Sequence, residues 1–346
     1  MSSFNLAYSP KEIYAELEII TQAGLVPMIT GSPGTSKSAI VAKFSKDYGL
    51  KLIDCRLGTM MPEDLNGLPM REGKKATFAP FDLFPVEGDP LPKGYQGWLI
   101  FFDEITSAMK PTQAAAYKII LDKMVGSLKL HENVVMVAAG NKMTDKAVVN
   151  AMSTALQSRM IHLELEPNVD DWTEHALKSG FDQRVIAYVN EMPSRLMNFK
   201  PEVAGTEKNF PCPRTLEFLS RLVKGRDVTE KNLGRFAGCI GQGAAIEFIT
   251  FCKLYGTLPK VSDIIADPVK TNIPNEASAK YAVMFMLVEH ADAKSIDPIL
   301  VYMKRFGIDQ QIVFSRAVHS KNPTLLEKNQ NFVGYMQDML RYMQAA

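Results

Sequence analysis

The sequence is poor in residues that hold metals or form disulfides. Its 346 residues include only four cysteines and five histidines. The histidines show no metal-ligand spacing. The cysteines form no CxxC pair, so neither a zinc knuckle nor a disulfide framework is indicated. We therefore expect a protein of the reducing cytoplasm. The scattered cysteines are Cys55, Cys212, Cys239 and Cys252.

Long apolar runs and an excess of one charge are also missing. No apolar segment approaches the roughly 20 residues that cross a bilayer, and no basic stretch followed by an apolar run begins the chain, so we expect a soluble protein without a membrane partner. The 39 basic and 38 acidic residues give a formal net charge of +1. Proteins that bind duplex nucleic acid usually carry an excess of basic residues, so this balance argues against nucleic acid as a partner. A local basic patch is still compatible with it.

The order of apolar segments predicts an α/β core followed by helices. Single cores stop growing at roughly 250 to 300 residues, so a second, smaller domain is expected. Up to Pro167, strand candidates alternate with helical stretches, which predicts a mainly parallel sheet with helices on both faces. We place this core at 1–167, a helical domain at 168–260 and a C-terminal helical extension at 261–346. Expected strands are 25–30, 50–57, 98–102, 134–139 and 161–165; expected helices include 38–48, 111–124, 146–156, 169–178, 181–191, 213–224 and 232–255.

A glycine-rich loop joins the first of these strands to the following helix. A phosphate needs backbone N–H groups at a helix N-terminus, a lysine that reaches the outer phosphates and a hydroxyl for Mg²⁺. The loop has the spacing GxxxxGK[ST], except that a serine stands where the last glycine is usual. That side chain could crowd the phosphate and weaken binding or turnover, and a plain turn is the alternative interpretation. The loop reads Gly31, Ser32, Pro33, Gly34, Thr35, Ser36, Lys37 and Ser38.

Polar side chains end two of the expected strands. Asp103 and Glu104 follow the apolar strand 98–102, at the edge where an open α/β sheet has its ligand crevice. We interpret Asp103 as a Mg²⁺ ligand, mostly through water, and Glu104 as the group that orients and polarises an attacking water. Asn141 follows strand 134–139 and could hold that water or the terminal phosphate without adding charge. The alternatives are a solvated strand end and a loop asparagine.

Five motifs together resemble the MoxR-like AAA+ ATPases. They occur in the order of that family and cover more than half of the chain. The segments around Trp172 and Phe218 also resemble bacterial and phage members, some of which have a small residue at the position of Ser36. The motifs are 31–38, Phe101-Phe102-Asp103-Glu104, Ala138-Ala139-Gly140-Asn141, Leu156-Gln157-Ser158-Arg159 and Pro211-Cys212-Pro213-Arg214-Thr215.

The resemblance implies a role for each motif. It implies an AAA+ P-loop core with an all-helical lid at 168–260, binding ATP and Mg²⁺, in subunits that form a hexameric ring. A guanidinium at Arg159 can project into a neighbour's phosphate site, and one at Arg214 can tie the lid to the γ-phosphate of its own or the neighbouring subunit. The implied roles are Walker A at Lys37 and Ser38, Walker B at Asp103 and Glu104, sensor 1 at Asn141, arginine finger at Arg159 and sensor 2 at Arg214.

The stretch 59–80 looks like the short helix and hairpin inserted in this branch of AAA+ proteins, near the pore or partner face. Met60 and Met61 are adaptable contacts or, alternatively, core residues, and Lys74 and Lys75 are expected at the hairpin tip. The function we expect is ATP hydrolysis coupled to chaperone-like remodelling of a protein partner, which in this family is often a von Willebrand factor A domain protein. The alternatives are a nucleic-acid motor or loader on the same core and a nucleotide-gated binding module with weak hydrolysis.

Overall fold

The computed structural model describes residues 7–145, 150–200 and 209–345. These residues form two compact units. The first holds residues 7–145, 150–166 and 200, and the second holds residues 167–199 and 209–345. None of the described helices is long and apolar enough to cross a membrane.

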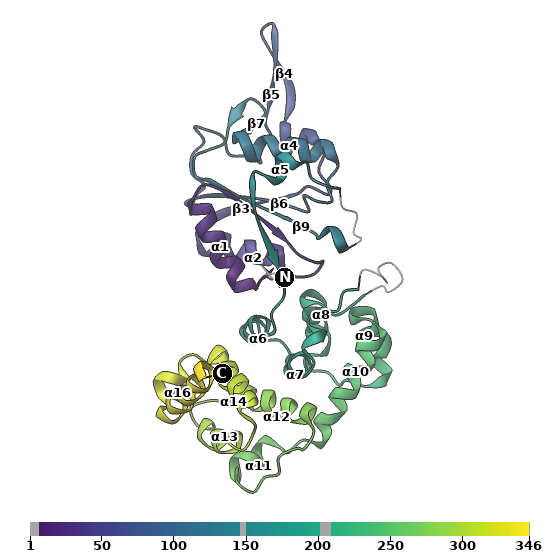
Figure 1. Cartoon of the computed structure of the whole chain (residues 1–346), viewed down its shortest axis with the longest axis vertical. Coiled ribbons are helices and arrows are strands. Elements are labelled where there is room, and N and C mark those ends of the chain that lie inside the picture. Colours follow the sequence, from purple (N-terminus) through teal and green to yellow (C-terminus); the bar gives the residue numbers. More distant parts are fainter. Residues whose placement is uncertain (1–6, 146–149, 201–208, 346) are drawn as a thin grey trace. The chain divides into compact units, whose positions relative to one another are not determined.

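The first unit is built on a six-stranded sheet in which neighbouring strands are parallel throughout. This confirms the predicted mainly parallel α/β core. Helices α1 (Pro10–Gln22) and α2 (Lys37–Asp47) cover one face of the sheet, and α4 (Lys110–Asp122) covers the other (Figure 1). The strand order is β1 (Ala7–Tyr8), β10 (Met160–Leu165), β2 (Val26–Thr30), β9 (Val134–Gly140), β6 (Gly97–Asp103) and β3 (Leu50–Arg56).

Strand β6, which lies between β9 and β3, shows why the sheet is covered on both faces. All seven of its residues are buried. Successive side chains of a strand point to opposite faces, so an apolar strand must be covered on both. Trp98, Ile100 and Phe102 pack in the cluster that includes α4, whereas Leu99 and Phe101 pack in the cluster that includes α1 and α2. The continuous apolar run in the sequence follows from this double burial.

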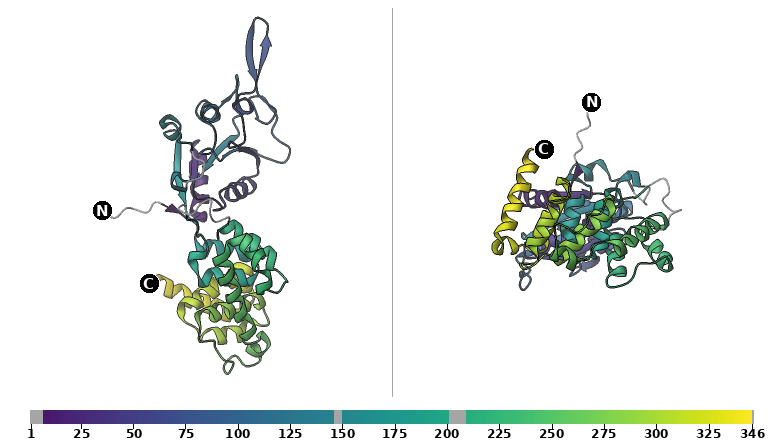
Figure 2. Two further views of the ribbon diagram at one scale, coloured as in Figure 1. Left: turned by 90° about the vertical axis from the view of Figure 1, so that its right-hand side faces the viewer. Right: turned by 90° about the horizontal axis from the view of Figure 1, so that it is seen from below.

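A short helix and a hairpin lie between β3 and β6. Helix α3 (Pro62–Asn66) precedes strands β4 (Leu68–Glu72) and β5 (Lys75–Ala79), which pair antiparallel. Gly73, with φ of 62°, makes the turn together with Lys74. The hairpin projects from the rest of the first unit (Figures 1 and 2). A second, smaller hairpin is made by β7 (Met124–Val125) and β8 (Leu128–Lys129).

The second unit consists of helices around one hydrophobic cluster that runs from Trp172 to Met339. This confirms the predicted helical region after the core. Where that region divides into a lid and an extension stays a prediction. Its α-helices are α6 (Val169–Lys178), α7 (Gln183–Glu191), α8 (Pro213–Val223), α9 (Leu233–Ile240), α10 (Gln242–Lys253), α11 (Val261–Ala266), α12 (Ala277–His290), α13 (Ile296–Met303), α14 (Ile308–Lys321), α15 (Leu325–Lys328) and α16 (Gln330–Ala345).

Two expected helices differ from the structure. The helix expected over 232–255 breaks at Gly241, where φ is 82° and an added Cβ would lie 2.8 Å from the carbonyl oxygen of Asn209. Of the helix expected over 146–156, residues 146–149 lie outside the described residues and 150–153 are not helical. Helix α5 (Thr154–Gln157) begins only after Ser153, whose hydroxyl accepts a hydrogen bond of 3.2 Å from the N–H of Leu156. In both places a residue that favours a helix end outweighs the apolar periodicity.

Candidate functional site

The strand order brings the predicted polar residues of the first unit to one edge of the sheet. Strand β9 lies between β2 and β6, and the carboxyl ends of these parallel strands face the same way. The loop after β2, Asn141 after β9 and Asp103 at the end of β6 therefore lie side by side. The N–H of Gly31 donates a hydrogen bond of 3.3 Å to the carbonyl oxygen of Gly140, which joins the loop to β9 directly.

The glycine-rich loop has two residues in the left-handed region of backbone conformation. Gly34 has φ of 82° and Ser36 has φ of 68°. A side chain in this region costs roughly 1–2 kcal/mol, because Cβ crowds the following carbonyl oxygen. Glycine would avoid that cost, and the sequence has serine instead. Inside the loop, the hydroxyl of Thr35 donates a hydrogen bond of 2.8 Å to the carbonyl oxygen of Ser32.

The ammonium group of Lys37 is turned into the loop. Lys37 is 8 % exposed. Its Nζ donates to the carbonyl oxygens of Gly31 at 2.6 Å and Ser32 at 3.2 Å, and to Oδ1 of Asn141 at 3.2 Å. A buried ammonium is stable only where it is paired or hydrogen-bonded. The lysine is therefore held at the mouth of a concave loop, next to the predicted sensor asparagine.

The first residue after Lys37 contacts the end of β6. The hydroxyl of Ser38 donates a hydrogen bond of 2.7 Å to Oδ2 of Asp103, which is 9 % exposed. The other oxygen of Asp103 accepts a hydrogen bond of 2.9 Å from the N–H of Glu104. A hydroxyl and a carboxylate side by side are the hard oxygen ligands that Mg²⁺ takes when it is bound through few protein groups and a phosphate. The donor set of this site therefore fits magnesium.

Glu104 differs from Asp103 in exposure and in backbone conformation. Its side chain is exposed, and φ is 56°, which a non-glycine residue rarely adopts. Oε2 of Glu104 lies close to Gly58. A Cβ added to Gly58 would be 2.6 Å from this oxygen. The exposed side chain of Glu104 thus lies beside Gly58, and the missing Cβ of that glycine leaves room for the carboxylate.

The two predicted arginines are both exposed. Arg159 follows the short helix α5 in the first unit, and its Nη1 donates to the hydroxyl of Ser158 at 3.1 Å. Arg214 is the second residue of α8, in the second unit. Within the described part of the chain, Arg159 forms no hydrogen bond or ion pair with the loop 31–38, with Asp103 or with Asn141. Their roles as finger and sensor stay predictions.

Sequence reasoning missed three residues of this site. Thr106 accepts a hydrogen bond of 3.0 Å from the N–H of Asn141, and its Oγ1 would lie 2.7 Å from a Cβ at Gly140. Asp145 accepts a hydrogen bond of 3.2 Å from the hydroxyl of Ser32. Gly58 makes room for Glu104. Only Asp145 gave a signal in the sequence, since it is a carboxylate shortly after the strand that ends at Asn141.

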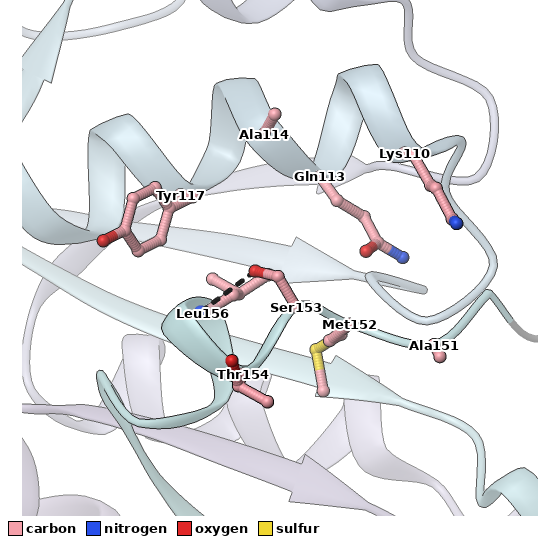
Figure 3. A pocket seen from close by; sticks show the side chains of 9 residues that line it. All are labelled: Lys110, Gln113, Ala114, Tyr117, Ala151, Met152, Ser153, Thr154 and Leu156. Atoms are coloured by element: carbon pink, nitrogen blue, oxygen red, sulfur yellow. Dashed lines mark hydrogen bonds between the residues drawn. The ribbon is translucent and has the colours of Figure 1, made fainter.

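A separate hollow of about 490 Å³ lies on the first unit between α4 and the segment 151–156 (Figure 3). Lys110, Gln113 and Tyr117 line it from the helix, and Met152 lines it from the facing segment. None of its lining residues belongs to the predicted site. Among the described residues, no group of three or more His, Cys, Asp or Glu side chains is placed to hold a metal ion elsewhere.

Comparisons with known proteins identify similar structures only at a distance. A scan against known protein families and a search of curated protein sequences both gave no match. A crystal structure of a candidate ATPase from Cytophaga hutchinsonii is 13% identical with a TM-score of 0.37, over 97% of this chain and 90% of that one. A variant of RuvB from Thermotoga maritima is 14% identical with a TM-score of 0.35, over 93% and 85% of the two chains. These scores are too low to support an assignment of function.

Proposed function

We propose that the first unit binds ATP with Mg²⁺ and hydrolyses it, as an AAA+ ATPase of the MoxR-like kind. The hydrogen bond between Ser38 and Asp103 is the observation that carries the proposal, because it joins the start of the loop helix to the acidic end of β6. A glycine-rich turn that binds no ligand would not require a carboxylate next to the first turn of the following helix. The buried Lys37 inside the same loop supplies the charge that phosphate needs.

Each residue of the proposed site has a task that follows from its position. The N–H groups at the start of α2 and the ammonium of Lys37 bind the phosphates. Ser38 and Asp103 hold the magnesium ion, which when bound neutralises charge on the phosphate oxygens. Glu104 orients the attacking water from its exposed position, and Asn141 lies where it can contact that water or the terminal phosphate.

The assembly and the partner are further parts of this proposal. We propose a homo-oligomeric ring, a hexamer, in which Arg159 completes a neighbour's site, and Arg214 couples the helical second unit to the nucleotide state. The client is a protein, with a von Willebrand factor A domain protein as the candidate partner, and remodelling of that client uses the energy of hydrolysis. The exposure of both arginines is what supports this assignment.

The test is phosphate release from ATP by the purified chain, with and without Mg²⁺, and with and without DNA. The proposal expects hydrolysis that requires Mg²⁺ and does not respond to DNA. No hydrolysis under any of these conditions, together with no binding of ATP, would refute it. Stimulation by DNA would favour a motor or loader on the same core.

A nucleotide-gated binding module with weak hydrolysis is the second candidate. The observation in its favour is Ser36, which has a side chain in the left-handed conformation where the motif usually has glycine. Tight ATP binding without turnover, in rings as well as in monomers, would favour this candidate over the ATPase.

A further inference from the structure

A buried carboxylate next to the phosphate loop has no part in the proposed reaction. Asp145 ends the 3-10 turn η1 (Met143–Asp145), shortly after Asn141, and is 4 % exposed. Its Oδ1 accepts the hydrogen bond of 3.2 Å from the hydroxyl of Ser32. Its Oδ2 is buried and has no hydrogen-bond partner among the described residues.

The burial of this carboxylate is costly. A charged group that is removed from water loses its hydration, and hydrogen bonds and nearby charges must offset that loss. Burial raises the pKa of Asp145. The hydrogen bonds from Ser32 and from the backbone of Lys142, together with the charges of Lys142 and Lys37, oppose this only in part. The bond to Ser32 needs only an acceptor, so an asparagine would keep it without burying a charge.

The bond between Ser32 and Asp145 is a second link between the loop and the segment after β9. Lys37, at the end of the loop, bonds to Asn141, and Ser32, near its start, bonds to Asp145. Between these two residues of the segment lies Lys142, whose Nζ is 2.5 Å from Glu164 and 3.6 Å from Glu166. The segment 141–145 is therefore tied to β10 on one side and to both ends of the loop on the other.

Ser32 is the residue through which a fixed Asp145 would act on the phosphate site. The carbonyl oxygen of Ser32 accepts from both Thr35 and Lys37. A phosphate that binds the ammonium of Lys37 competes with this carbonyl for the same protons. The bond to Asp145 does not depend on Lys37, so it keeps Ser32 in place while the lysine changes partner.

We propose that Asp145 is a positioning residue of the phosphate loop, which it holds in its binding conformation through the hydroxyl of Ser32. The inference rests on the proposed nucleotide site. Among the described residues, Asp145 bonds to the loop at Ser32 and forms no hydrogen bond with the proposed magnesium ligands, so its action is on the loop.

The test is isothermal titration calorimetry with ADP and Mg²⁺ on five chains: wild type, Ser32→Ala, Asp145→Ala, the double variant and Asp145→Asn. Each alanine variant is expected to raise Kd about tenfold. The double variant should raise it no further, because both changes remove the same bond. Asp145→Asn should stay within about threefold of wild type, since its Oδ1 still accepts from Ser32.

A control variant separates positioning from loss of stability. Asn190→Ala removes another buried side chain, one whose amide donates to the hydroxyl of Thr173 at 2.8 Å in the second unit. It should lower the melting temperature and leave Kd unchanged. The inference is overturned if Asp145→Ala binds ADP like wild type, if the two alanine effects add, or if Asp145→Asn is as weak as Asp145→Ala. If wild type binds no ADP and equals Lys37→Ala, the proposed function falls and the inference falls with it.

Discussion

The hydroxyl of Ser38 and the carboxylate of Asp103 are joined by a hydrogen bond of 2.7 Å, although 65 positions separate them in the chain. One stands at the start of α2, and the other ends β6. Strand β9 lies between β6 and the strand that leads into α2. The contact therefore depends on the order of three strands as well as on two motifs.

Lys37→Ala and Glu104→Gln should separate binding from turnover. Lys37→Ala removes the ammonium that the loop holds inside it, so ATP binding should be lost. Glu104→Gln keeps the size of an exposed side chain and removes only its charge, so ATP should still bind while turnover stops. Binding by calorimetry and phosphate release measure the two effects. A Glu104→Gln chain that hydrolyses ATP at the wild-type rate would show that the Walker B assignment is wrong.

Ser36→Gly should increase affinity for ATP or turnover. Ser36 has φ of 68°, so glycine relieves a strain of about 1 kcal/mol and lets the backbone approach the phosphate. The greater freedom of glycine in the unfolded chain offsets part of this gain, so the melting temperature should change little. Steady-state kinetics and thermal melts check both statements. A clear loss of activity would mean that the serine is adapted to this site.

Gly58→Ala should reduce kcat about tenfold without changing the Kd for ATP. A Cβ at Gly58 would lie 2.6 Å from Oε2 of Glu104, and the flexible carboxylate is the group that can move away. A small displacement of a positioned catalytic group is sufficient for such a loss. Gly234→Ala is the matched control, since a Cβ there meets no atom within 4 Å. Equal kcat in both variants would contradict the role given to Glu104.

Arg159→Ala should lower turnover by a factor on the order of 10³ and leave nucleotide binding largely intact, as for other arginine fingers. The turnover rate per subunit should also rise with protein concentration as rings form. Arg341→Ala, which removes another exposed guanidinium, is the control. It should change neither the turnover rate nor the dependence of that rate on protein concentration. A concentration-independent rate from a proven monomer would remove the ring proposal.

Mixing two inactive variants tests whether Arg159 acts across subunits. Some interfaces in a mixed ring pair an intact Glu104 with an intact Arg159. Adding Arg159→Ala subunits to Glu104→Gln subunits should therefore restore part of the activity. No recovery, in rings shown to contain both variants, would count against a finger that acts in a neighbouring subunit.

Asp145→Asn should make the chain more stable at neutral pH. Burial raises the pKa of Asp145 above its ordinary value of 3.8, so the folded state binds the proton more tightly than the unfolded state. The stability linked to this proton is present below pH 3.8 and decreases as the pH rises through the raised pKa. Urea unfolding should accordingly show a gain for the variant at pH 7 that shrinks towards pH 4. If the free energy of unfolding of wild type increased as the pH rises, the charges of Lys37 and Lys142 would lower the pKa of Asp145 by more than burial raises it.

Much of the architecture could be predicted from local patterns. Alternating apolar strands and helices indicate a parallel sheet covered on both faces, because a strand buried on both faces has a continuous apolar run, as β6 has from Trp98 to Phe102. The spacing of the loop 31–38 and the polar residues at the strand ends indicate phosphate and magnesium chemistry, because parallel strands place their carboxyl ends together. The helices expected over 146–156 and 232–255 were wrong in extent, because Ser153 and Gly241 favour helix ends that periodicity does not register.

Only the tertiary structure decided which of these groups touch. The space that Gly58 leaves for Glu104 and the bond between Ser32 and the buried Asp145 both depend on residues distant in the chain. Residue types and their spacing determine the chemistry of a segment, since propensity and periodicity act over a few residues. Strand order and side-chain packing determine the contacts, since they minimise the free energy of the whole unit, and no short stretch of the sequence contains that information.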